Sequence, residues 1–121
     1  MPHITVEYTA NIPNEANIDE LLIKANQSLI SHGDTFSPDG IRSRAIKLNN
    51  YVVGDGTNDG AFVHVTLQIA SGRTEEIRKA VLDHLFTTIE SHFEELMVNK
   101  DITLSLQLSE LDGDGNMYKQ N

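Results

Sequence analysis

The strongest constraint on the fold is that one order of patterns occurs twice along the 121-residue chain. Residues 2–9 alternate apolar and polar side chains, as a half-buried strand does. From Asn17, with Glu20 at the capping-box position, apolar residues recur on one helical face, and Gly33 favours the end of that helix. Residues 41–53 form a second extended pattern. The first half therefore predicts a strand, a helix and a strand.

The second half repeats this order. Residues 61–69 alternate cleanly, and 74–76 open a helix with acidic residues in its positive first turn. The apolar residues of this predicted helix recur every fourth position: Ile77, Val81, Leu85, Ile89, Phe93 and Met97. A last strand follows at 102–109. Turn-forming residues over 54–60 separate the two halves.

We interpret the chain as a single domain, 1–121, with one β-α-β unit over 1–56 and another over 57–121. Right-handed crossovers would give one four-stranded sheet with both helices on one face. The second face would then lack a cover. Polar residues would suit exposure to solvent there, yet Phe62, Tyr8 and several arginines lie on the predicted strands. We expect other subunits to cover it.

The charge of the chain limits its partners. Nine Lys and Arg residues stand against 18 Asp and Glu, a net charge of −9. Such a surface repels nucleic acids and anionic membranes, and neither a signal peptide nor a membrane-spanning run is present. The chain has no cysteine, which is consistent with a cytoplasmic protein. An anionic ligand would have to be attracted by arginines placed locally.

Three arginines are candidates for that role. Arg42 and Arg44 have the same strand parity, so both point to one face, where they either line a pocket or form solvent-exposed ion pairs. Arg73 lies beside a predicted helix N-terminus, where backbone N–H groups also favour an anion. Alternatively, Arg73 borders a turn and pairs with a surface acid.

Motifs for other chemistry are missing from the sequence. The five histidines do not have the spacing of metal ligands, and the segment 112–116 resembles a calcium loop only until Met117 replaces the required glycine. Signatures of nucleophilic serine, phosphate-loop and dinucleotide sites are also absent. The sequence thus predicts no metal and no cofactor.

The proline at position 2 admits two interpretations. Proline cannot donate a backbone hydrogen bond, but it is tolerated at the first position of a strand. If Met1 is removed, Pro2 instead presents a secondary amine whose pKa starts near 8 and is lowered by burial or nearby cations. That amine could act as a general base near neutral pH.

Several segments carry a family resemblance: MPHITVEYTANI, GIRSRA, DGAFVHVTLQIASGRT and FEELM. Together they closely resemble the 5-carboxymethyl-2-hydroxymuconate Δ-isomerase family of the tautomerase superfamily, which includes 4-oxalocrotonate tautomerase and MIF-like proteins. The resemblance runs from Met1 to about Leu111. It implies an α+β fold with a mixed four-stranded sheet, a homotrimer with active sites at subunit contacts, and a cofactor-free isomerase of homoprotocatechuate degradation.

The resemblance also implies residue roles. Pro2 would be the acid/base that moves a proton along a dienol, while Arg42 and Arg73 would bind a substrate carboxylate or the developing oxyanion. Arg44 would be a neighbouring substrate-binding residue. Two alternatives stay open: a tautomerase of a smaller 2-hydroxydienoate or an aryl pyruvate, and a non-catalytic trimeric module that binds small carboxylates.

Overall fold

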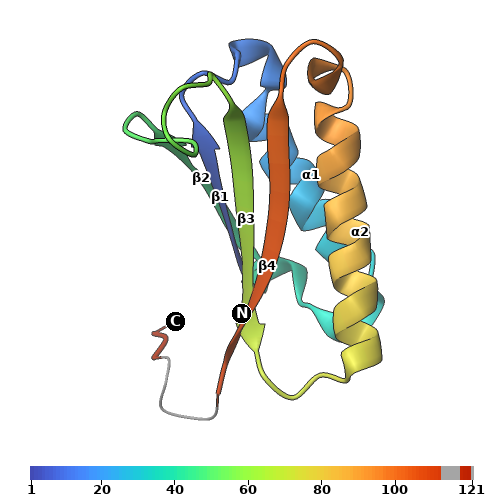
Figure 1. The fold of residues 1–121 in the computed structure, drawn as a ribbon. Helices are drawn as coiled ribbons and strands as arrows, with labels where there is room; N and C mark the ends of the chain where they lie inside the picture. The colour runs from blue at the N-terminus through green and yellow to red at the C-terminus, as the bar shows by residue number, and fades with distance from the viewer. Residues whose placement is uncertain (113–117, 121) are drawn as a thin grey trace.

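The computed structural model describes residues 1–112 and 118–120 (Figure 1). Its helices and strands follow the order β1 (His3–Thr9), α1 (Ile18–Ile30), β2 (Arg42–Leu48), β3 (Ala61–Ala70), α2 (Glu75–Phe93) and β4 (Ile102–Leu111). The sheet order is β2-β1-β3-β4. Strands β1 and β2 are parallel, as are β3 and β4, whereas β1 and β3 are antiparallel. The predicted mixed sheet is therefore confirmed.

Both helices begin where the sequence predicts. The Asn17 side-chain oxygen accepts a hydrogen bond of 3.2 Å from the Glu20 backbone N–H, and the Asn17 amide donates to Glu20 Oε2 at 3.1 Å. At the start of α2, Thr74 Oγ1 accepts from the Ile77 backbone N–H at 3.2 Å. The bonds accepted by Asn17 and Thr74 each satisfy a backbone donor that has no partner within the helix, and the Asn17 amide contact holds the capping side chain in place.

Two predicted ends are wrong. The extended segment predicted over 41–53 ends as a strand at Leu48, because β2 pairs only with β1 and that strand ends at Thr9. The helix predicted to continue to Met97 ends at Phe93, the last residue of its buried stripe. A short 3₁₀ turn, Leu96–Val98, follows and leaves Met97 41% exposed.

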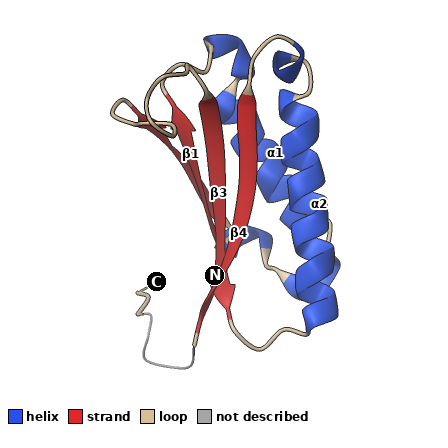
Figure 2. Ribbon diagram, viewed as in Figure 1, coloured by secondary structure: helices blue, strands red, loops and turns tan. Residues whose placement is uncertain are grey.

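The helices cover one face of the sheet and leave the other open (Figure 2). The covered face and the helices supply the core, including Ile4, Val6, Val63, Val65, Leu67, Leu85 and Phe93. Tyr8 has the strand parity of Ile4 and Val6 and packs against this core, so it does not contribute an apolar group to the open face. Phe62 lies on the open face, where its ring meets Tyr51 edge-on at 6.3 Å.

The described portion of the chain has no helix with the length and apolar character of a membrane span. The calcium-like segment singled out from the sequence falls mainly on 113–117, which lie outside the described residues.

Candidate active site

The first ladder contact of the sheet explains the proline at position 2. The Pro2 carbonyl accepts a hydrogen bond of 3.0 Å from the backbone N–H of Arg42, and the register of β1 and β2 begins with the next residue, His3, opposite Arg42. Pro2 is buried. The sheet thus uses the carbonyl of Pro2 as an acceptor and needs no donor from its nitrogen. This is compatible with Pro2 as a tolerated first strand residue and with Pro2 as a catalytic amine.

A pocket of about 310 Å³ lies at this end of the sheet. Pro2, Arg42 and Arg73 all line it, together with residues of the loop between α1 and β2, among them Thr35 and Phe36. These three predicted site residues come from the start of β1, the start of β2 and the turn before α2. The fold therefore brings together residues that are up to 71 positions apart in the sequence.

Arg73 is fixed by neutral partners. Its Nη1 donates to the Ala70 carbonyl at 3.0 Å and its Nη2 to the Thr35 carbonyl at 3.3 Å, while its guanidinium carbon lies 4.7 Å from the centre of the Phe36 ring. No carboxylate within the described residues forms an ion pair with it. Carbonyls and a ring face orient the guanidinium without cancelling its charge, which is suited to an anionic ligand.

Arg42 and Arg44 share the open face, as their parity predicts, but they differ in position. Arg42 donates through Nη1 to the Asp39 carbonyl at 2.5 Å and lines the pocket that contains Pro2. Arg44 lines an adjoining pocket of about 560 Å³ with His3. Arg42 borders both pockets, so it connects them.

His3 contacts this group of cations. Arg44 Nη1 lies 3.0 Å from His3 Nδ1, and since the guanidinium can only donate, Nδ1 accepts. Burial, the Arg44 guanidinium, the terminal amino group and Arg42 all lower the pKa of His3, in that order of importance. The imidazole is therefore held neutral, so it positions Arg44 without adding further positive charge.

The site contrasts with the overall charge of the protein. Among the described residues, Asp39 is the one acidic side chain that lines either pocket, against Arg42, Arg44, Arg73 and Lys119. The chain as a whole carries a net charge of −9. A locally positive pocket on a negative protein selects small anions that reach it and repels large polyanions elsewhere.

Sequence reasoning missed several lining residues. Phe36 belongs to no recognisable sequence motif, although it lies in the loop that leads into β2. Thr35 acts through its backbone carbonyl, which any residue could supply. Lys119 follows a segment with no helical or strand periodicity. A positive residue near an otherwise acidic terminus was the one available signal for it.

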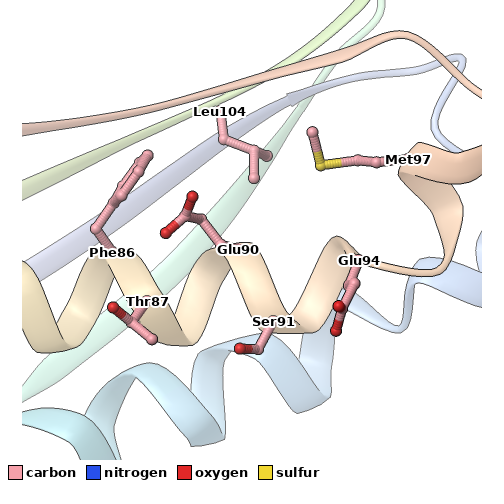
Figure 3. A pocket seen from close by; sticks show the side chains of 7 residues that line it. All are labelled: Phe86, Thr87, Glu90, Ser91, Glu94, Met97 and Leu104. Carbon is pink, nitrogen blue, oxygen red and sulfur yellow. The ribbon is translucent and has the colours of Figure 1, made fainter.

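A different hollow, of about 510 Å³, lies between α2, the 3₁₀ turn and β4 (Figure 3). Glu90 and Glu94 line it alongside Phe86, Met97 and Leu104, and no Lys or Arg does so among the described residues. It is poorly suited to a carboxylate. Within the same part of the chain, no three His, Asp or Glu side chains are grouped to hold a metal ion.

Comparison with known proteins agrees with this geometry. The family model described as 5-carboxymethyl-2-hydroxymuconate isomerase matches residues 2–121. The chain is 40% identical to the Escherichia coli 5-carboxymethyl-2-hydroxymuconate Delta-isomerase, over 100% of this chain and 94% of that protein.

Solved structures resemble it as well. The 5-carboxymethyl-2-hydroxymuconate isomerase of Deinococcus radiodurans R1 superposes with a TM-score of 0.92 at 40% identity, covering 99% of this chain and 89% of that one. A wild-type fused 4-OT that forms a symmetric trimer shares the fold, with a TM-score of 0.68 at 18% identity over 98% and 93% of the two chains. The chain belongs to the 5-carboxymethyl-2-hydroxymuconate isomerase family.

Proposed function

We propose that this isomerase converts 5-carboxymethyl-2-hydroxymuconate to its 2-oxo-3-ene isomer, within the degradation of homoprotocatechuate in the cytoplasm. The observation that carries the proposal is the meeting of Pro2, Arg42 and Arg73 in one pocket, in a chain whose family is named for this substrate. The reaction is a proton transfer and needs no cofactor.

The chemistry requires one group that both accepts and donates a proton. Once Met1 is removed, Pro2 has a secondary amine at the pocket. The neutral amine takes the proton of the 2-hydroxyl group, the C2–O bond becomes a carbonyl, and the 2,4-diene electrons shift to leave a double bond between C3 and C4. The prolinium then delivers the proton to C5. While Met1 is attached, the Pro2 nitrogen is an amide without a basic lone pair.

The arginines stabilise the charge that develops on the dienolate. Arg73, already oriented by two carbonyls and the Phe36 ring, would bind the C1 carboxylate or the 2-oxyanion together with Arg42. Negative charge at the oxygen is greater in the transition state than in the neutral dienol. Oriented cations there lower the barrier and do more than improve substrate binding.

We further propose that the enzyme is a homotrimer. The open face of the sheet contains Phe62, together with Ile46, which is 47% exposed, and it is not covered by either helix. Covering this face with other copies would bury these apolar groups beside the Arg42 and Arg44 pockets. Sedimentation velocity would test the proposal; a monomer at micromolar concentration would contradict it.

The function is tested by following ketonisation of 5-carboxymethyl-2-hydroxymuconate by ultraviolet absorbance. One preparation has lost Met1, as shown by intact mass, and the other retains it. Turnover in the first that is abolished in the second supports the amine mechanism. Equal turnover in both would exclude Pro2 as the base, and turnover only of smaller 2-hydroxydienoates would contradict the substrate.

Arg73→Ala provides an independent test of the anion site. Loss of a charge-assisted contact that strengthens in the transition state should lower kcat/KM by about tenfold or more. Lys79→Ala is the control for loss of one positive charge, since Lys79 lies near the start of α2 and its exposed side chain pairs with Asp83 at 2.8 Å. An unchanged kcat/KM in Arg73→Ala would remove its assigned role.

A further inference from the structure

Two pockets meet at the end of the sheet where β1 begins, and one lysine from the far end of the chain borders both. Lys119 lines the pocket that contains Pro2 and Arg73, and it also lines the adjoining pocket that contains His3 and Arg44. This residue is 117 positions from Pro2 along the chain. Lys119 therefore adds a positively charged side chain to the boundary between the two pockets.

We propose that Lys119 is a specificity-determining residue that binds the carboxylates at the C5 end of the substrate. This inference rests on the proposed function. 5-Carboxymethyl-2-hydroxymuconate has three carboxylates, and the C1 carboxylate and 2-oxygen already occupy Arg73 and Arg42. The other two carboxylates are both attached through C5. In the described residues, the remaining cations that line these pockets are Arg44 and Lys119.

The two cations differ in a way that suits the reaction. Arg44 is held against His3 at 3.0 Å, so its planar donor group has a fixed direction. Lysine carries a compact charge with three donors on a flexible stem. When C5 accepts the proton it changes from planar to tetrahedral, and its two carboxylate-bearing branches leave the plane of the diene. A lysine ammonium can follow that movement.

This role predicts which kinetic constant changes. Lys119 would bind groups that do not react and that keep their charge throughout, so it stabilises the ground state and the transition state nearly equally. Removal of such uniform binding raises KM and leaves kcat almost unchanged. The effect should also depend on whether the substrate has carboxylates at its C5 end.

The test compares three substrates with the full chain after Met1 removal. 5-Carboxymethyl-2-hydroxymuconate has two carboxylates at the C5 end, 2-hydroxymuconate has one, and 2-hydroxypenta-2,4-dienoate has none. Lys119→Met keeps an unbranched side chain one atom shorter than lysine and removes its charge. It should raise KM about ten- to a hundredfold for the first substrate, less for the second and under about twofold for the third, as expected for one lost charge-assisted contact.

Lys79→Met is the matched control. It makes the same change in net charge at an exposed position of α2, where Lys79 pairs with Asp83 at 2.8 Å. KM should not change with any of the three substrates. Lys119→Arg keeps the charge and should recover most of the affinity of the unchanged protein. An equal loss on all three substrates in Lys119→Met, or no loss on any, would overturn the proposal.

Binding measurements separate this inference from the proposed function. Calorimetric titration with propane-1,2,3-tricarboxylate and with acetate needs no turnover. If the unchanged protein fails to isomerise any dienol, the proposed function is wrong, and the titration still decides the role of Lys119. A loss of about tenfold in tricarboxylate affinity in Lys119→Met, with Lys79→Met unchanged, supports the binding role; equal affinity in all three proteins overturns it.

Discussion

The guanidinium carbon of Arg73 lies 4.7 Å from the centre of the Phe36 ring, and this contact joins the turn before α2 to the loop before β2. A cation over an aromatic face is worth about 1 kcal/mol when it is partly desolvated. Phe36 is itself 3% exposed, so it both packs in the core and supports the arginine. These two roles can be separated by mutation.

Phe36→Leu should raise KM about fivefold, because the arginine loses the ring that orients it. The same change should lower the free energy of unfolding by about 1–2 kcal/mol. Phe93→Leu is the control: Phe93 is completely buried in α2 and should lose similar stability with an unaltered KM. Steady-state kinetics and urea unfolding measure the two effects. A similar KM in both variants would contradict a positioning role for Phe36.

The hydrogen bond between Arg44 and His3 predicts a change in titration. Arg44→Gln removes one of the cations that lower the pKa of His3, so that pKa should rise. It should stay below the ordinary value of about 6.5, because burial is the larger cause and Arg42 remains. Histidine chemical shifts followed by NMR against pH measure the change. A His3 pKa that is unaltered or falls further would show that Arg44 does not face the ring.

The contact between His32, which follows α1, and His84 of α2 predicts how stability depends on pH. His84 Nδ1 lies 3.2 Å from His32 Nε2, and burial followed by the charge of His84 lowers the pKa of His32. The unfolded chain therefore binds a proton at higher pH than the folded chain does. The stabilising contribution is complete above about pH 6.5 and is lost as the pH falls through the lower folded pKa.

Urea unfolding near pH 7.5 and near pH 5 tests this dependence. His84→Gln and His32→Gln should each reduce the drop in midpoint between the two conditions, since one removes the neighbouring charge and the other removes the titrating ring. If the urea midpoint falls by the same amount between the two pH values in the unchanged protein and in both variants, other groups in the molecule cause the loss of stability in acid.

The start of α1 predicts a difference between two small substitutions. Asn17 has φ of 49°, in the left-handed region, and its side chain caps the helix. Asn17→Ala loses the cap and strains the backbone, at a cost of about 1–2 kcal/mol in the free energy of unfolding. Asn17→Gly loses only the cap and should lower the free energy of unfolding by about a few tenths of a kcal/mol. Urea unfolding at one pH compares them; equal costs would show that the backbone conformation contributes nothing.

The sequence predicted the elements whose signals are local. The alternation of Ile4 and Val6, the cap at Asn17 and the start of a helix at 74–76 depend on neighbouring residues, and the structure has them as expected. The end of β2 depends on where its partner β1 stops, which no pattern within 41–53 reveals. Prediction therefore failed where a distant element decides the boundary.

The residues of the site likewise divide into those that the sequence could predict and those that only the folded chain reveals. Pro2, Arg42 and Arg73 were found through a family resemblance and through their places at element ends, and the fold brings them to one pocket. Phe36 and the Thr35 carbonyl could not be found, because a ring that supports an arginine and a carbonyl that accepts from it leave no sequence signature. Such contacts follow from tertiary packing alone.

The β-α-β unit occurs twice in the chain, but the proposed Pro2 base occurs once, and the antiparallel pairing of β1 and β3 separates the starts of the two units. The two β-α-β units begin at opposite ends of the sheet, so Gly60, which precedes β3 as Pro2 precedes β1, lies far from the first pocket. Gly60 is joined to Asp59 by a peptide bond and can never become a chain terminus. Repetition of the unit has thus not repeated the proposed base, so covalent modification of the one Pro2 amine in each chain that has lost Met1 should consume all of the activity.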